Sequence, residues 1–266
     1  MNDHPVGVFD SGLGGLTVLQ ALDDLLPHEH LIYLGDTARY PYGPRSEDEL
    51  RRFSVEIAEF LMGFDIKMLV VACNSATAAA LELLRERYEI PVIGVVEPGL
   101  RAAVSTTRTG SVAVIGTEVT ASSKVYEHTA ESLRLDLDLT VEACPGFVEL
   151  VEAGDTDGAR AHQLVADQLR VLEGHDVDAL VLGCTHYPLL ARTIKDVVGR
   201  GVTLVSSADE TAFEVKDILE RTGMVREQEG AARRTFFTTG DPETFRRLGE
   251  RFLGFPLEDV RAHRWD

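Results

Sequence analysis

The chain has 266 residues, enough for about two compact domains at ~150 residues each. Its 26 basic and 44 acidic side chains give a formal net charge of −18, which argues against a nucleic-acid partner or an anionic membrane partner. The longest charge-free stretch, residues 68–81, is too short and too polar to span a bilayer, which needs ~18 apolar residues. Met1 leads almost directly into a strand-like run and leaves no room for a signal peptide, so a cytoplasmic protein is expected.

Short apolar runs alternate with helical patterns along the chain. Strands are predicted over residues 6–9, 31–34, 68–72, 92–96, 112–115, 139–143, 179–182, 202–205 and 235–238. Apolar spacing of three to four residues predicts helices over residues 16–26, 47–62, 76–88, 159–172 and 189–198. Continuous apolar strands that alternate with helices are typical of parallel sheets covered on both faces, so the predicted class is α/β.

The three cysteines, Cys73, Cys144 and Cys184, form an odd, sparse set that does not suit a disulfide framework. When Cys73 is aligned with Cys184, both neighbourhoods read as an apolar strand, a small residue, the cysteine, a small polar group and a helix. Each of these two cysteines is therefore expected at the carboxyl end of a strand, where open α/β sheets bind ligands. Two such ends facing each other would form a cleft with one thiol on each wall. Cys144, beside Pro145, is expected to be structural.

This internal similarity predicts two pseudo-symmetric domains, each a mostly parallel sheet flanked by helices, with the active site in the cleft between them. A Pro-Gly break at residues 97–99 follows a predicted strand, and a new helix is predicted after the strand that ends at residue 205. The expected first domain is discontinuous and contains residues 1–97 and 209–266. The second contains residues 98–208.

A glycine-rich turn, residues 10–17, follows the first predicted strand. It fails the dinucleotide template G-x-G-x-x-G because Thr17 stands where the third glycine belongs, and Asp10 would repel a pyrophosphate. Ser11 and the free backbone N–H groups of the next helix suit a small anion such as a carboxylate. We therefore expect no nucleotide cofactor.

Metal and pyridoxal phosphate are also disfavoured. Cys184 and His186 lie two residues apart, but the sequence contains neither C-x-x-C nor H-E-x-x-H, so no metal site is expected. None of the chain's lysines is predicted to lie where it could form a Schiff base with pyridoxal phosphate. We therefore expect the protein to use no cofactor.

Two further segments contribute polar groups near the predicted cleft. Residues 36–44 follow the second strand as a loop shaped by prolines and a glycine, in which Asp36 either lines the cleft or caps the turn. Glu149 and Glu152 begin a predicted helix after the Cys144 strand, where solvent exposure near the helix dipole is the alternative to a role in the site.

Two thiols on opposite walls of a cleft would limit the reactions that the protein can catalyse. A single cysteine with a histidine suits nucleophilic acyl transfer, which has no use for a matching second cysteine, and redox pairs are usually C-x-x-C. Opposed thiols suit stereoinversion, in which one thiolate removes a proton from carbon and the other thiol delivers one to the opposite face. A free thiol pKa of ~8.5 is close enough to neutrality for either role.

Taken together, the ordered blocks resemble the glutamate racemases of the aspartate/glutamate racemase superfamily over essentially the whole chain. The blocks are residues 8–16, 35–43, 73–77, 114–117, 149–154 and 182–188. The resemblance implies a cofactor-independent racemase that interconverts L- and D-glutamate and supplies D-glutamate for peptidoglycan. Two departures occur: Ser75 replaces the usual threonine, and residues 205–208 replace a more usual acidic-serine sequence.

The resemblance also implies roles for individual residues. Cys73 would deprotonate D-glutamate and Cys184 L-glutamate, with Asp10 and His186 assisting and Glu152 and Asp36 as secondary catalytic candidates. The implied substrate contacts are Asp10, Ser11, Tyr42, Gly43, Asn74, Ser75, Thr117, Thr185 and His186.

Three alternatives stay open: a racemase for aspartate or another acidic amino acid, a non-catalytic small-ligand binding module, and a metal-dependent hydrolase. The expected partner is a small molecule, glutamate. The sequence marks no oligomer interface, and a homodimer is one assembly to consider.

Overall fold

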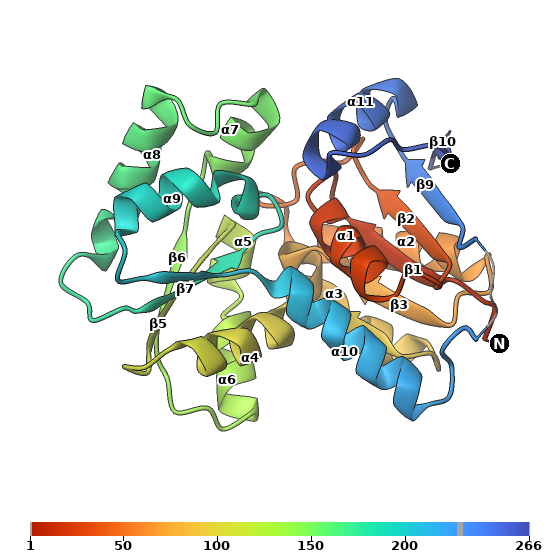
Figure 1. The fold of residues 1–266 in the computed structure, drawn as a ribbon, viewed down its shortest axis with the longest axis horizontal. Helices are drawn as coiled ribbons and strands as arrows, with labels where there is room; N and C mark the ends of the chain where they lie inside the picture. Colours follow the sequence, from red (N-terminus) through yellow and green to blue (C-terminus); the bar gives the residue numbers. More distant parts are fainter. Residues whose placement is uncertain (1, 228–230, 266) are drawn as a thin grey trace.

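The computed structural model describes residues 2–227 and 231–265, which form two separate parallel sheets (Figure 1). The first has the strand order β10-β9-β2-β1-β3-β4, and the second β6-β5-β7-β8. The first contains β1 (Val6–Asp10), β2 (Leu31–Gly35), β3 (Met68–Val71), β4 (Val92–Gly94), β9 (Arg234–Thr238) and β10 (Val260–Ala262). The second contains β5 (Ser111–Gly116), β6 (Asp138–Ala143), β7 (Ala179–Gly183) and β8 (Thr203–Val205). The predicted α/β class and all nine predicted strands are confirmed.

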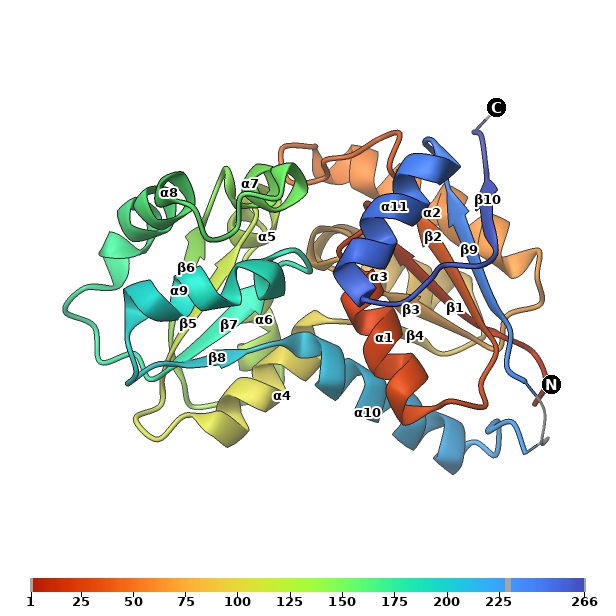
Figure 2. The same cartoon turned by 45° about the horizontal axis from the view of Figure 1, so that its top comes forward.

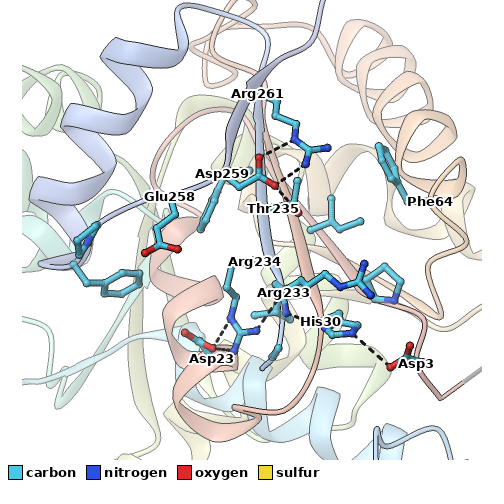
Figure 3. A pocket seen from close by; sticks show the side chains of 17 residues that line it. Asp3, Asp23, His30, Phe64, Arg233, Arg234, Thr235, Glu258, Asp259 and Arg261 are labelled. Carbon is cyan, nitrogen blue, oxygen red and sulfur yellow. Dashed lines mark hydrogen bonds and ion pairs between the residues drawn. The ribbon is translucent and has the colours of Figure 1, made fainter. Parts of the chain in front are cut away.

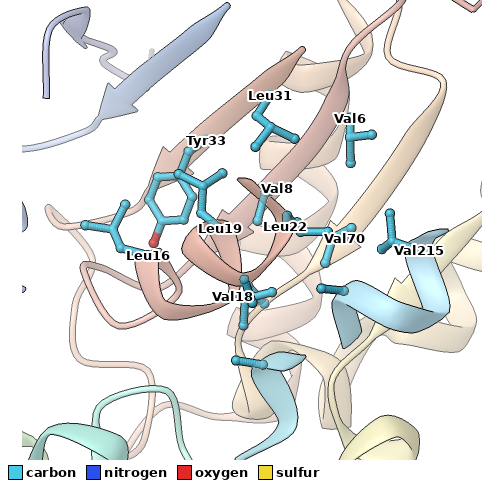
Figure 4. Packing of buried hydrophobic residues seen from close by; sticks show 14 of the residues in the cluster. Val6, Val8, Leu16, Val18, Leu19, Leu22, Leu31, Tyr33, Val70 and Val215 are labelled. Carbon is cyan, nitrogen blue, oxygen red and sulfur yellow. The ribbon is translucent and has the colours of Figure 1, made fainter. Parts of the chain in front are cut away.

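Helices cover both faces of the first sheet. One face packs against α1 (Leu16–Leu25), α10 (Ser207–Arg221) and α11 (Pro242–Leu253), and the other against α2 (Glu47–Met62) and α3 (Asn74–Arg87). Figure 4 shows the first interface, where the apolar side of α1 lies on Val6 and Val8 of β1. Phe9, the next residue along the strand, belongs to the opposite core, as the alternation of side chains in a strand requires.

The second sheet is covered in the same way (Figure 2). One face packs against α4 (Val96–Thr106) and α6 (Val125–Ser132). The other packs against α7 (Phe147–Ala153), α8 (Ala159–Leu169), α9 (Ala191–Val198) and the short 3₁₀ helix η2 (Tyr187–Leu190). The 3₁₀ helix η1 (Arg170–Leu172) extends α8, and α5 (Glu118–Ser122) follows the end of β5.

The region around Pro98 differs from its prediction. The strand expected over residues 92–96 ends at Gly94, and the expected Pro-Gly break lies inside α4. Proline is tolerated there because the first-turn N–H groups of a helix have no intrahelical partner. A Cβ on Gly99 would lie 3.3 Å from the Cβ of Ser207, so glycine lets α4 pass close to α10. Residues 6–94 and 234–262 supply the first sheet and residues 111–205 the second, while the domain division itself stays a prediction.

A buried ion pair joins distant segments at the amino-terminal end of the first sheet. Lys67 Nζ lies 2.6 Å from Glu29 Oε2, and the two side chains are 1% and 2% exposed. Lys67 Nζ also donates to the carbonyl oxygens of Asn2, at 2.9 Å, and Met224, at 2.7 Å. The pair thus connects the start of the chain, the segment before β2, the segment before β3 and the segment that follows α10.

Within the described part of the chain, no helix has both the length and the apolar character needed to cross a membrane.

Candidate active site

A narrow pocket of about 20 Å³ lies where the carboxyl ends of β1, β3, β5 and β7 meet. Cys73, which follows β3, and Cys184, which follows β7, both line it. The full lining is Ser11, Tyr40, Pro41, Tyr42, Gly43, Cys73, Asn74, Ser75, Thr117, Val148, Cys184, Thr185 and His186. Both sheets therefore contribute to one pocket, and the structure brings eight of the nine predicted substrate contacts to its wall, Asp10 being the exception.

The surroundings of Cys73 disfavour its thiolate form. Its side chain is buried at the N-cap position of α3. Burial raises the pKa of the Cys73 thiol well above its usual range, and the nearby Asp10 charge adds to the rise, against a smaller opposing effect of the Ala76 backbone N–H. A thiol with a raised pKa gives up its proton only to a strong base, such as a carbanion.

Cys184 has a different environment, because it contacts a histidine that in turn contacts a carboxylate. Its Sγ lies 3.9 Å from His186 Nδ1, and His186 Nε2 lies 3.2 Å from Glu152 Oε1. Burial lowers the pKa of His186, but the interactions with Cys184 and Glu152 outweigh burial and raise it to about 10. The surroundings of His186 therefore favour its protonated form, which places a cationic ring next to the Cys184 sulfur.

Asp10 supports the pocket from behind its wall. Its side chain is fully buried and does not line the pocket. The Gly12 N–H donates to Asp10 Oδ2 at 3.0 Å, and the Thr185 hydroxyl donates to Oδ1 at 3.3 Å. Asp10 thus connects the turn after β1 with the residue that follows Cys184.

Asp36 also lies outside the lining, so the structure does not bring this predicted catalytic candidate to the pocket. Its buried carboxylate accepts hydrogen bonds from Arg39, Tyr42, Thr239 and Trp265. The Tyr42 hydroxyl is one of these donors, at 2.5 Å, and Tyr42 lines the pocket. Asp36 therefore positions its own loop, closer to the turn-capping alternative than to a catalytic role.

Uncharged hydrogen bonds cross between the two halves of the molecule at the pocket. Asn74 Nδ2 donates to the Tyr126 hydroxyl at 2.8 Å, and the Ser75 and Thr117 hydroxyls lie 2.9 Å apart. The residues of α3 are thereby joined to α6 and to the N-cap of α5. Ser75 makes this contact through its hydroxyl alone.

Four residues near the pocket were not predicted. Tyr40, Pro41 and Val148 line it, and Tyr126 holds Asn74 from the second half. Tyr40 lies in the same loop as Tyr42 and Gly43, which were predicted, so its place in this loop could have marked it as a pocket residue. Its ring centroid is 5.9 Å from that of His186, and its buried hydroxyl has no hydrogen-bond partner among the described residues.

Cys144 lies apart from this chemistry. Its side chain is 1% exposed in the core of the second half, and burial raises its pKa to about 12.

A wider hollow lies at the start of β2 and β9 and contains neither pocket cysteine (Figure 3). Its charged groups largely neutralise one another. Arg234 pairs with Asp23, and Arg261 pairs with Asp259 at 2.7 Å. The two thiols that line one pocket, rather than the size of a hollow, therefore identify the candidate active site.

Comparison with known proteins shows the family of the chain. A sequence model of the family described as Asp/Glu/Hydantoin racemase matches residues 13–215, so the chain is an amino-acid racemase of that family. The glutamate racemase of Beutenbergia cavernae is 49% identical, over 98% of this chain and 93% of that protein. Within the family, the chain belongs to the glutamate racemases.

Solved structures show the same relationship. The crystal structure of a glutamate racemase isoform from Bacillus anthracis has a TM-score of 0.95 and 44% identity, covering 99% of this chain and 98% of that chain. The glutamate racemase of Francisella tularensis, solved in complex with D-glutamate, has a TM-score of 0.93 and 30% identity, covering 99% of this chain and 98% of that chain. The fold and the racemase class predicted from the sequence are confirmed.

Proposed function

We propose that the chain interconverts L- and D-glutamate by proton transfer between the substrate α-carbon and two thiols, without a cofactor. The observation that carries this proposal is the placement of Cys73 and Cys184 in one pocket with opposite electrostatic surroundings. One sulfur is held neutral, and the other lies beside a cation. Such a pair holds one proton donor and one proton acceptor at the same time.

In the L-to-D direction, the Cys184 thiolate forms an S–H bond as the α-C–H bond of L-glutamate breaks. The electron pair stays on carbon, and it takes the proton of the Cys73 thiol on the other face, which leaves Cys73 as the thiolate. The D-to-L direction reverses each step. Glu152 supports the imidazolium of His186, and Asp10 orients the hydroxyl of Thr185.

An anionic substrate must bind a chain whose net charge is −18. Local donors make this feasible, because the fourteen-residue helix α3 begins at Asn74 beside the pocket and presents its N-terminal N–H groups. Hydroxyls of Ser11, Thr117 and Thr185 lie around the same space. We assign these groups, with Tyr42, Gly43 and Ser75, to the substrate.

The experiment is incubation of the purified chain with L-glutamate in D₂O, followed by chiral separation and mass spectrometry. D-Glutamate carrying one α-deuterium supports the proposal, and the absence of both inversion and exchange contradicts it. L-Aspartate in parallel separates the glutamate enzyme from a racemase for another acidic amino acid. The proposal includes supply of D-glutamate for peptidoglycan in the cytoplasm and a homodimer, and sedimentation tests the homodimer.

Gly14 is predicted to be essential for the geometry around Cys184. A Cβ at this position would lie 2.3 Å from Thr185 Oγ1 and 2.6 Å from His186 Nδ1. Gly14→Ala is expected to lower kcat by about a hundredfold, because displacements near 1 Å can cost that much. Gly201→Ala is the matched control, since a Cβ there meets nothing within 4 Å. Equal kcat values for the two variants would contradict the assignment of His186 and Thr185.

His186 is predicted to make stability depend on pH. Its pKa rises from 6.5 to about 10 on folding, so the folded state binds the proton more tightly than the unfolded state. This contribution is fully present below pH 6.5 and is lost as the pH rises through about 10. Urea denaturation between pH 6 and 10 should show the decline, and His186→Gln should flatten it. If the wild-type free energy of unfolding rose between pH 6 and 10, and His186→Gln abolished that rise, the assignment would be refuted.

A further inference from the structure

The last residues that the structure describes lie near the loop of residues 36–44, which contributes to the wall of the pocket. After β10, His263 N–H donates to the Thr238 carbonyl oxygen at the end of β9, at 2.8 Å. The His263 ring lies 4.0 Å from the ring of Phe60 in α2, and the Trp265 ring packs edge-on against His263 at 4.4 Å. We call residues 263–265 the C-terminal tail. Trp265 is the only tryptophan in the chain.

The tail reaches the buried carboxylate of Asp36. Trp265 Nε1 donates to Asp36 Oδ1 at 3.0 Å, and the Thr239 hydroxyl donates to the same oxygen at 2.8 Å. The other oxygen accepts from Arg39 Nε at 2.6 Å and from the Tyr42 hydroxyl at 2.5 Å. Each carboxylate oxygen therefore has two donors, and the tail supplies one of the four.

Trp265 also holds the neighbouring arginine. The Arg39 guanidinium lies 4.3 Å from the centroid of the Trp265 ring and 4.1 Å from that of Phe53, so it is stacked against both. Arg39 pairs in addition with Glu56 of α2. The loop is thus fixed at Asp36 and Arg39, while the residues that follow, Tyr40 to Gly43, line the pocket.

We propose that Trp265 is a positioning residue for the substrate, acting through Asp36 on Tyr42. Loss of its N–H leaves a buried carboxylate with fewer donors, and such a carboxylate reorients toward those that remain. The Tyr42 hydroxyl shares that carboxylate, so its ring and the adjoining Gly43 shift at the pocket wall. This inference rests on the proposed glutamate racemase activity.

Trp265→Phe is expected to raise the KM for glutamate about tenfold and to change kcat by less than about twofold, because one charge-assisted hydrogen bond to a binding loop is lost while both thiols stay in place. Arg264→Ala changes the exposed neighbour and serves as the control, with unchanged KM. A KM of Trp265→Phe within about twofold of wild type would overturn the proposal.

A double-mutant cycle separates positioning from general stability. Tyr42→Phe removes the hydroxyl that connects Asp36 to the pocket and keeps the ring. If Trp265 acts through this connection, the KM of Trp265→Phe/Tyr42→Phe should resemble that of Tyr42→Phe alone. Fully additive effects would show that Trp265 acts by another route and would refute the mechanism.

The single tryptophan gives a second measurement that needs no variant of the tail. Glutamate added to the wild-type chain should change the Trp265 emission with a midpoint close to KM, and Tyr42→Phe should weaken this response. An active wild-type enzyme whose emission is unchanged at saturating glutamate contradicts the proposal. A wild-type chain that does not racemise glutamate contradicts the proposed function instead.

Discussion

Replacement of Cys73 or Cys184 by alanine is expected to lower kcat for glutamate racemisation by about a thousandfold or more, because in the proposed mechanism each thiol carries the proton on one face of the substrate. Both sulfurs line the same pocket, and each follows a different sheet's strand. The remaining thiol cannot reach the opposite face of the α-carbon. Chiral analysis of the product in both directions, with circular dichroism to verify folding, is the measurement.

Cys144→Ala is the matched control for this pair. Cys144 is also buried, but it lies in the core of the second half and not in the pocket. Its replacement should leave kcat unchanged and should cost only modest stability, about 1 kcal/mol for a small buried side chain. Substantial racemisation by Cys73→Ala or Cys184→Ala would eliminate the two-thiol mechanism.

Replacement of Lys67 by methionine is expected to lower the free energy of unfolding by about 3–5 kcal/mol, since it leaves a buried carboxylate without its cation. Glu29 and Lys67 are 2% and 1% exposed, and Lys67 also binds the carbonyl oxygens of Asn2 and Met224. The loss therefore affects four segments of the chain together. Urea denaturation at neutral pH measures it.

Two comparisons sharpen this test. Lys216→Met removes a half-exposed lysine whose Nζ lies 3.9 Å from Glu220, and it should cost less than about 1 kcal/mol. Lys67→Met/Glu29→Gln should be less destabilised than the sum of its single variants, because the uncompensated charge is removed. A loss for Lys67→Met as small as that for Lys216→Met would show that the buried pair contributes little.

The sheets were predictable from the sequence because parallel strands buried on both faces consist of continuous apolar runs. The cysteine pair was predictable because the two halves share a local pattern around Cys73 and Cys184. The short edge strand β10 was not predicted, since its three residues, Val260–Ala262, are too few to show a pattern. Helix α4 was missed because proline and glycine usually mark a break, whereas here one occupies the first turn and the other permits close packing.

The roles of the carboxylates were harder to predict, because their partners are far away in the chain. Asp36 binds Thr239 and Trp265, which lie near the opposite end of the sequence. Glu152 was a weak candidate by position alone, and its contact with His186 appears only when α7 lies beside the segment after β7. A residue type suggests which chemistry is available, but folding decides whether that chemistry faces the pocket.

The uncharged bonds from Asn74 to Tyr126 and from Ser75 to Thr117 have a kinetic consequence. Separating the two halves at the pocket would break these two neutral hydrogen bonds, at about 1 kcal/mol each in water, together with the bond from Thr185 to Asp10. Such a barrier is low enough for the opening motion to be fast. Because neither of the two bonds involves a charge, added salt screens the substrate's charges but does not weaken these bonds.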